Sequence, residues 1–284
     1  MGSLVYIRWS GWIIVPFWLT TMSWLFAHDV YSALTAGEAP TLSTIDAGRR
    51  QDARTQFTIL DASGRELGAI WSVALPGDSA ARREDFIWLD QLSLPIGPVR
   101  IRVESTFTDA GALDEFSVSA DSPGATAWIH GERFYAAFSF TLEGWIGDRR
   151  INENFKIPLS DGESLSASVH PFMPLTGLEV GRSWRMQVLN PFNAITGMGA
   201  KFEPVLVTVT DRETISTPAG MIACNVVQAP RAKAWIDDAG VVQAQEVELP
   251  MLGRFRFVRQ SKFDEASLSA KRQIALFDRR DQRR

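Results

Sequence analysis

Few residues in this chain have the types and spacings that chemistry requires. The three histidines are His28, His130 and His170, and none has a second metal-type ligand at a spacing typical of a zinc site. The single cysteine, Cys224, lies in the mostly apolar run 221–227, which is typical of a buried strand. We therefore interpret it as an unreactive core thiol, and one cysteine also excludes an internal disulfide.

Hydroxyl and carboxylate chemistry is also weakly indicated. Residues 77–79 read Gly-Asp-Ser, like the start of a serine-esterase block, but no aspartate stands three residues before either downstream histidine. Asp237-Asp238 lacks the further oxygen ligands that calcium takes. A carboxylate pair for glycoside hydrolysis is set by proximity in space, so a hydrolase stays a third interpretation of the chain. We predict that the protein is not an enzyme and uses no cofactor or metal.

Large apolar side chains stand in two segments that we expect to be loops. Residues 170–175 read HPFMPL and residues 190–195 read NPFNAI, so proline interrupts both of them. Loops are usually polar because they are usually solvated. The two segments therefore either plug one end of a barrel or border an apolar opening that meets a lipid or a partner. The residues that we expect to line an apolar binding site are Phe138, Phe140, Trp184, Met186, Phe192 and Trp235.

The elements that must position these residues begin with an apolar segment near the N-terminus. The run from Trp9 to Ala27 carries no charge, and as a helix it would span roughly 28 Å at about 1.5 Å per residue, close to the hydrocarbon thickness of a bilayer. We predict a transmembrane anchor over 1–28, followed by a juxtamembrane linker over 29–48. The tryptophans that suit the membrane and its interfaces are Trp9, Trp12, Trp18 and Trp24.

The charges that flank this segment predict its orientation. Arg8 precedes it, whereas Asp29 and Glu38 follow it and the next basic residue is Arg49. Because basic residues stay on the cytoplasmic side, we expect the N-terminus in the cytoplasm and the rest of the chain in the periplasm. The protein would then be a single-pass protein of the cytoplasmic (inner) membrane. The alternative is a cleaved signal peptide, although no clear small-residue cleavage site follows the run.

Alternation of apolar and polar residues predicts strands over most of the remaining chain, from 49 to 265. The clearest segments are 99–104, 134–142, 184–188 and 254–257. Such strands bury one face and expose the other, as antiparallel strands do. We expect tight turns at Gly131-Glu132, Asp161-Gly162 and Pro218–Gly220, and short helices near 45–55 and 265–278. The pattern predicts an all-β fold, either a strongly curved antiparallel sheet or a partly open β-barrel.

An internal similarity divides this β domain into two lobes in one interpretation. Thr108–Leu113 reads TDAGAL and Asp237–Val242 reads DDAGVV, each between two strand patterns. The two segments either mark related lobes over 49–160 and 161–265 or use one common turn twice. Beyond the domain, residues 266–284 form a basic tail, which is either a solvated end or a contact for anionic head groups or an acidic partner.

The block 178–260 resembles a known group of proteins. It combines Val180-Gly181 and Trp184, then Pro218–Gly220 and Cys224, then Trp235–Asp237 and a strand with Phe255 and Phe257. This arrangement is similar to the DUF3108-type bacterial envelope proteins, which are distantly related to the LolA/LolB-like lipoprotein-carrier fold. The resemblance implies an open, strongly curved antiparallel sheet around an apolar cavity, which holds acyl chains in the carriers. The predicted uncleaved anchor departs from those carriers, because a tethered protein cannot cross the periplasm with its cargo.

These observations lead to two functional hypotheses. The first is a membrane-tethered binding or carrier domain for an apolar ligand, a lipid or a lipid-linked molecule, since burial of a chain releases about 0.8 kcal/mol per methylene. The second is a non-catalytic scaffold or accessory subunit of a cell-envelope complex, which the anchor would position for a protein partner. The net charge of −4 gives no reason to expect nucleic acid as a partner.

Overall fold

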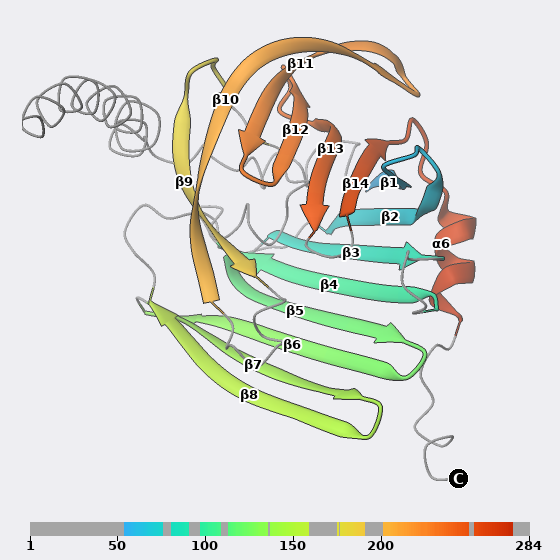
Figure 1. Cartoon of the computed structure of the whole chain (residues 1–284), viewed down its shortest axis with the longest axis vertical. Coiled ribbons are helices and arrows are strands. Elements are labelled where there is room, and N and C mark those ends of the chain that lie inside the picture. Colours follow the sequence, from blue (N-terminus) through green and yellow to red (C-terminus); the bar gives the residue numbers. More distant parts are fainter. Residues whose placement is uncertain are drawn as a thin grey trace, which may run out of the picture.

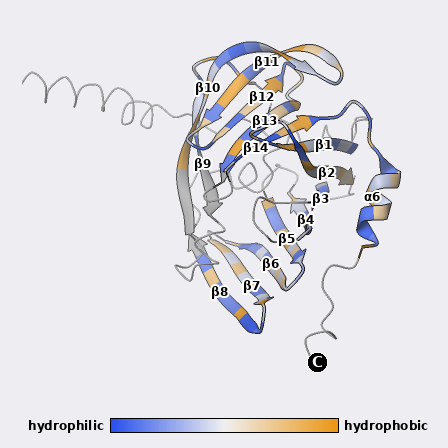
Figure 2. Ribbon diagram, turned by 45° about the vertical axis from the view of Figure 1, so that its right-hand side comes forward, coloured by the Kyte–Doolittle hydropathy of each residue, from blue (hydrophilic) through white to orange (hydrophobic). Residues whose placement is uncertain are grey.

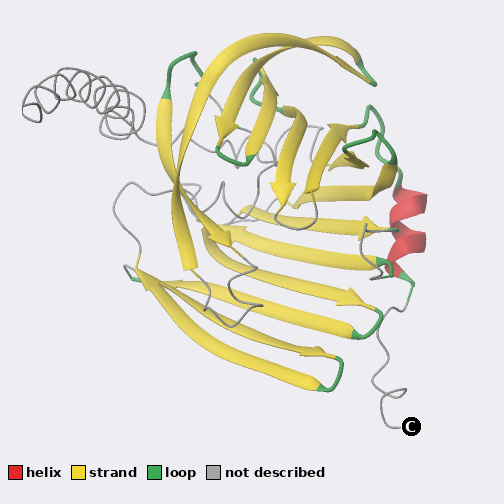
Figure 3. Ribbon diagram, viewed as in Figure 1, coloured by secondary structure: helices red, strands yellow, loops and turns green. Residues whose placement is uncertain are grey.

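The computed structural model describes residues 54–75, 81–90, 97–108, 113–135, 137–158, 175, 177–190, 201–249 and 253–274. Within these ranges the protein is all-β, with a 14-stranded antiparallel sheet and one short helix (Figure 1, Figure 3). The first series of strands is β1 (Arg54–Asp61), β2 (Glu66–Leu75), β3 (Ala81–Leu89), β4 (Val99–Phe107), β5 (Leu113–Ser122), β6 (Ala125–Phe134), β7 (Ala137–Ile146) and β8 (Arg149–Pro158). The second series is β9 (Ser183–Asn190), β10 (Lys201–Thr217), β11 (Gly220–Ala229), β12 (Ala232–Asp237), β13 (Val242–Leu249) and β14 (Gly253–Arg259), followed by the helix α6 (Glu265–Arg272).

Hydrogen bonds join the strands in the order β8-β7-β6-β5-β4-β3-β2-β1-β14-β13-β12-β11-β10-β9. Within each series every strand pairs with its neighbours in sequence, and β1 pairs with β14 to join the two series. The predicted segments 49–160 and 161–265 therefore each supply a continuous half of one sheet. The strand order does not test whether the two halves are related lobes, so that relation stays a prediction.

The sheet is strongly curved, and its concave side encloses an apolar core. Phe57 of β1 packs in one cluster with Trp184 of β9 and Val207 of β10, although these strands lie far apart in the sheet order. Such contacts require the sheet to curl round, as Figure 1 shows from β8 through β1 and β14 to β10. We call the concave side the inner face. The inner core consists of Phe57, Ile59, Leu67, Ile70, Trp184, Val207, Val209, Val227, Ile236, Val242 and Phe255.

Successive side chains of each strand point to opposite faces, and paired residues of antiparallel neighbours share a face. On β3, Ile87 packs against the inner core, whereas Phe86 and Trp88 belong to a cluster on the convex, outer face. Figure 2 shows the resulting mixture of apolar and polar residues along the strands. The strand predicted from the alternation in 99–104 is confirmed as part of β4.

Helix α6 packs on the outer face. Asp264 caps its N-terminus, because the Asp264 side chain accepts a hydrogen bond from the Ser267 backbone N–H at 2.9 Å. Lys271 and Arg272 lie in its last turn, where cations complement the helix dipole. Leu268 is buried among the aromatic side chains of β2 and β3. The helix thus covers the outer side of these strands and leaves their inner side to the core.

The C-terminal segment differs from the predicted basic tail over 266–284. Residues 266–272 belong to α6, which confirms that part of the helix predicted near 265–278. The physical reason is Leu268, whose burial against the sheet holds the segment in a docked helix in place of a solvated end. Residues 275–284 lie outside the described part of the chain.

Packing between strands corrects two local predictions. Gly131-Glu132, predicted as a turn, lies inside β6, because a Cβ on Gly131 would come within 2.5 Å of the Phe116 ring and only glycine fits there. Phe134, predicted to continue into the following strand, instead ends β6, and Tyr135 (φ 54°) makes the turn to β7. The turn predicted at Pro218–Gly220 is confirmed between β10 and β11, where Gly220 has a φ of 113°.

Several predictions fall outside the described residues. They include the anchor over 1–28 with its tryptophans, the linker over 29–48, the turn at Asp161-Gly162 and most of the helix near 45–55. The last two residues of that predicted helix, Arg54 and Thr55, belong instead to β1. In the part of the chain that the structure describes, no helix is both long and apolar enough to cross a bilayer. The anchor therefore stays a prediction.

Candidate functional site

Phenylalanines of β5, β7 and β8 form an aromatic patch on the inner face. The ring centroids of Phe138 and Phe140 lie 5.2 Å apart, and Phe116 lies 5.8 Å and 5.6 Å from them. Phe155 stacks on Phe140 at 4.9 Å. Gly131 of β6 pairs with both Phe116 and Phe140, and its missing side chain leaves room for the rings. We call Phe116, Phe138, Phe140 and Phe155 the aromatic patch.

The structure brings two of the predicted lining residues together in this patch, since Phe138 and Phe140 are both part of it and both buried. Trp184 lies on the same face of the sheet, buried in the inner core, and its Nε1 has no hydrogen-bond partner among the described residues. Met186 is part of β9, but its side chain is outside what the structure describes. Phe192 falls in the undescribed range 191–200.

Trp235 lies on the outer face, on the side of the sheet opposite to Trp184. The next residue, Ile236, is part of the inner core, so alternation turns Trp235 outward. Its Nε1 donates a 2.8 Å hydrogen bond to Glu213, and the Lys233 ammonium lies 4.6 Å from its ring centroid. Hydrogen bonds from Trp235 and then Lys233 lower the pKa of the Glu213 carboxyl. A single site on one face therefore does not include both tryptophans.

A buried charged pair lies on the inner face beside the aromatic patch. Arg83 and Asp85 of β3 share this face, and Arg83 Nε donates a hydrogen bond to Asp85 Oδ1 at 3.0 Å. Their side chains are 10% and 9% exposed. Ser72 of β2 pairs with Asp85, Ser105 of β4 pairs with Arg83, and both serines are buried. We call Ser72, Arg83, Asp85 and Ser105 the polar centre.

The strand register places the polar centre between two apolar groups of the inner face. Ser105 pairs with Phe116 of the aromatic patch. On the other side, Ile87 follows Asp85 by two residues on β3 and packs against the inner core. The inner face therefore passes from aromatic rings, through a charged pair, to aliphatic side chains. Apart from Phe155, the side chains of the aromatic patch and the polar centre are buried, so this succession of groups is part of the packed interior of the described chain.

Sequence reasoning missed the polar centre. Residues 82–85 read Arg-Arg-Glu-Asp, so every position is charged and the alternation that marks the buried side of a strand is absent. The available signal was the strand pattern that continues through Phe86–Leu89. A strand that runs through two bases followed by two acids places one acid–base pair on each of its faces.

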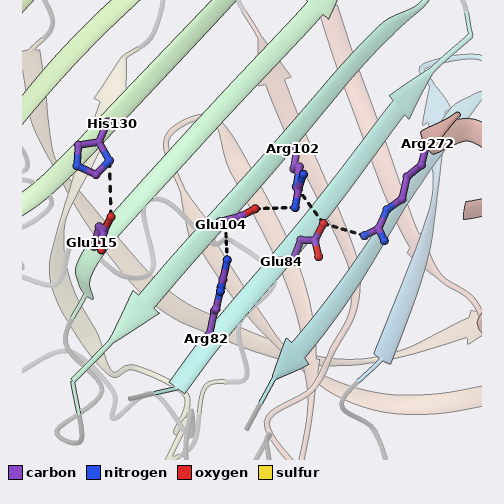
Figure 4. A network of polar contacts seen from close by, with 7 residues as sticks. All are labelled: Arg82, Glu84, Arg102, Glu104, Glu115, His130 and Arg272. Carbon is purple, nitrogen blue, oxygen red and sulfur yellow. Dashed lines mark hydrogen bonds and ion pairs between the residues drawn. The ribbon is translucent and has the colours of Figure 1, made fainter. Parts of the chain in front are cut away.

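The other two residues of 82–85, Arg82 and Glu84, lie on the outer face in a network of ion pairs (Figure 4). Arg82 contacts Glu104 at 2.5 Å, and Arg102 contacts both Glu104 at 2.7 Å and Glu84 at 3.0 Å. Arg272 of α6 reaches Glu84 at 2.8 Å. Exposed ion pairs contribute about 0–1 kcal/mol each, and the Arg272–Glu84 contact helps to fix α6 on the sheet.

The other titratable groups that bear on the predictions lie apart from one another in the described ranges. His130 faces Glu115 across 3.8 Å on the outer face (Figure 4) and stacks on Trp128. The prediction that Cys224 is a core thiol is confirmed, because the side chain is buried and free. Burial, helped by the nearby Asp237-Asp238 pair, raises the pKa of the Cys224 thiol to about 11. Among the described residues, no three His, Cys, Asp or Glu side chains are grouped for a metal ion.

The two apolar segments predicted as loops lie almost wholly outside the described residues. Of 170–175, the structure describes Leu175, whose backbone N–H donates to the Gly240 carbonyl at 2.9 Å and whose side chain packs against the inner core. Of 190–195, it describes Asn190 at the end of β9. Whether the segments border an opening stays a prediction.

Comparisons with known proteins add a distant structural similarity. No family model and no curated protein matches the chain. The crystal structure of a beta-barrel-like protein of domain of unknown function DUF1849 from Brucella abortus aligns with 73% of this chain and 96% of its own, with a TM-score of 0.42 and 7% sequence identity. The resemblance of residues 178–260 to DUF3108-type proteins and lipoprotein carriers stays a prediction.

Proposed function

We propose that this protein is a membrane-tethered, extracytoplasmic domain that binds an apolar ligand, a lipid or a lipid-linked molecule, on the inner face of a partly open barrel. The observation that carries the proposal is the continuity of the aromatic patch, the polar centre and the inner core on one concave face. The anchor expected over 1–28 would hold this face at the periplasmic surface of the cytoplasmic membrane. Lipids are the nearest apolar molecules at that place.

For a ligand that is dissolved in water, burial of an acyl chain supplies enough free energy for reversible binding, whereas a lipid already in the bilayer gains little from the same burial. About 12 methylenes at about 0.8 kcal/mol each release roughly 10 kcal/mol on transfer from water. Association costs at least about 4 kcal/mol in lost translational and rotational freedom, which leaves roughly 6 kcal/mol and a dissociation constant of tens of micromolar. A ligand held with this affinity exchanges readily, as a local carrier requires.

The test maps where an acyl chain touches the full-length protein. We would reconstitute the chain in phosphatidylcholine vesicles with a trace of palmitic acid that carries a diazirine, irradiate, and locate the adducts by mass spectrometry. We expect adducts on inner-face positions of β5 to β8. The variant Phe155→Glu, at a half-buried inner-face position of β8, should lose most of this labelling, whereas Asn154→Glu on the exposed outer face should not. Equal labelling of both faces, or labelling confined to residues 1–28, would overturn the proposal.

A second candidate function, a scaffold or accessory subunit of an envelope complex, is favoured by an exposed aromatic pair at the β6–β7 turn. Phe134 is 58% and Tyr135 is 88% exposed, and their rings meet edge to face at 4.7 Å. Tyr135 also has a left-handed φ of 54°, a conformation that non-glycine residues rarely adopt. Exposed aromatic side chains are enriched at protein interfaces.

This second candidate predicts a contact at one end of the sheet. A photoreactive amino acid in place of Tyr135 in the full-length protein should trap one partner in intact membranes. The same substitution at Glu143, an exposed residue of β7 away from the turn, should trap none. Absence of any adduct from position 135 would contradict the scaffold function.

A further inference from the structure

We propose that the ligand is an anionic amphiphile and that Arg83 binds its acidic head group, a carboxylate or a phosphate. This inference rests on the proposed function and assigns the polar centre a role within it. It adds a chemical class of ligand and a specific residue that recognises the class.

Recognition of a membrane lipid requires a polar interaction. An acyl chain that leaves a bilayer for the inner face exchanges one apolar environment for another, so the transfer itself gains little. Discrimination between the lipids of the membrane must then come from the head group. On the described inner face, the polar centre holds the buried ion pair, and Arg83 is its cation.

Arg83 has guanidinium donors available for a ligand. Its Nε donates to Asp85 at 3.0 Å, which leaves the Nη1 and Nη2 end of the guanidinium as the part that would meet a ligand. The terminal N–H groups of arginine form a planar fork that matches two oxygens of a carboxylate or phosphate. A neutral hydroxyl offers no such pair of acceptors, so the geometry favours an anion.

Asp85 orients the guanidinium through its Nε. A carboxylate on Nε holds the group from the side and leaves the end of the fork open. Asp85 also has an interaction besides the Arg83 hydrogen bond. Arginine stays protonated throughout the physiological pH range, so an anion can bind without proton transfer. The head-group site is therefore held in one orientation before the ligand arrives, which lowers the entropic cost of binding.

The distance between Arg83 and the aromatic patch suits a long acyl chain. Neighbouring strands lie about 4.8 Å apart, so β3 is roughly 10 Å from β5 and roughly 24 Å from β8 along the sheet. A head group on Arg83 would direct its chain along the register line through Ser105 and Phe116 towards the half-buried Phe155. Ser105 and Phe116 are 1% and 2% exposed, so the chain would have to displace the groups that cover them. Ser105 and Gly131 lie along this path on β4 and β6, and both are small residues.

The outer face supplies an internal control for this reasoning. Arg82 is the sequence neighbour of Arg83, but it points to the opposite side and pairs with Glu104 in an exposed position. Water and salt screen that pair, so it offers an anion little affinity. A role that belongs to Arg83 should therefore be absent at Arg82.

The test compares three photoreactive lipids on the full-length chain in phosphatidylcholine vesicles. They are diazirine-bearing palmitate, palmitoyl lysophosphatidate and monopalmitoylglycerol, which carry a carboxylate, a phosphate and no charge on the same chain. The labelling of inner-face residues of β5 to β8 is quantified for each. We expect at least one anionic lipid to label about 10-fold to 100-fold more than the neutral lipid, the factor typical of a charge-assisted hydrogen bond. The stronger of the two anionic lipids identifies the head group.

Paired variants assign the preference to a residue. Arg83→Gln combined with Asp85→Asn removes both buried charges together, so the polar centre stays neutral and we expect the protein to fold. This variant should reduce anionic labelling to the level of the neutral lipid. Arg82→Gln combined with Glu104→Gln should change nothing. Equal labelling by all three lipids, or a preference that survives the first variant with its thermal unfolding intact, would overturn the role of Arg83 and leave the proposed function standing. Labelling of the inner face by none of them would overturn the proposed function itself.

Discussion

Removal of one charge from the polar centre should destabilise the protein far more than the same change one residue away. Arg83→Gln leaves the Asp85 carboxylate buried, and Asp85→Asn leaves the Arg83 guanidinium buried, where each side chain is only 9–10% exposed. An uncompensated buried charge of this kind costs about 3–5 kcal/mol. Arg82→Gln on the outer face breaks a contact whose side chains are 54% and 27% exposed, and such a pair is worth about 0–1 kcal/mol.

The double variant separates the ion pair from the burial of each charge. Arg83→Gln with Asp85→Asn leaves no charge behind, and the two amides can hydrogen-bond to each other, so its cost should be within about 1 kcal/mol of zero. The measurement is urea unfolding of the full-length chain in a mild non-ionic detergent, followed by tryptophan fluorescence. With an m value near 3 kcal/mol per molar, each single variant should lower the midpoint by about 1–2 M.

This reasoning is refuted if Arg83→Gln and Arg82→Gln lower the free energy of unfolding by the same amount. If Arg83→Gln lowered the midpoint no more than Arg82→Gln, water would have to reach both arginines equally. The inner face would then hold no buried charge, and the argument for an anion site would lose its foundation. A double variant as unstable as the single ones would point instead to side-chain packing as the contribution that was lost.

Three further results follow from the packing of the sheet. Leu268→Ala should cost about 2–5 kcal/mol in urea unfolding and expose the C-terminal segment to limited proteolysis, because this side chain docks α6. Gly131→Ala should cost about 1–3 kcal/mol, since its Cβ would meet the Phe116 ring at 2.5 Å, and Phe116→Leu in the same chain should recover part of that loss. Cys224, with a pKa of about 11, is protonated at pH 8, so a thiol reagent should modify it in urea but not in the folded protein.

The class of fold followed from local patterns because the strands are half-buried. Alternation in 99–104 and 254–257 predicts β4 and β14, and each has neighbours on both sides that need one apolar and one polar face. The order of the strands did not follow. The pairing of β1 with β14 joins residues about two hundred positions apart, such as Phe57 and Arg259, and no periodicity within either segment encodes that contact.

Only part of the site was predicted, because an aromatic residue in a strand pattern indicates burial but not the face of the sheet on which it lies. Phe138 and Phe140 were predicted together, since their two-residue spacing places them on one side of one strand. Trp184 and Trp235 come from different strands, and only the register shows that they face opposite sides. Gly131 was misassigned to a turn for a related reason: glycine is typical of turns locally, but the Phe116 ring of the next strand is what requires it here.

Stability alone does not explain a buried ion pair in the polar centre. Replacement of such a pair by apolar side chains of similar size is often neutral or stabilising by about 1–4 kcal/mol, so folding by itself gives no reason to retain Arg83 and Asp85 on an inner face that is otherwise largely apolar. Positions that break the pattern of their surroundings are where function is expected. Water solvates the charges of helix α6 and of the outer network, so those charges cost little free energy. Water solvates the buried Arg83–Asp85 pair far less, so this pair needs a different compensating interaction. The anionic ligand that we propose, bound on that face, would supply it.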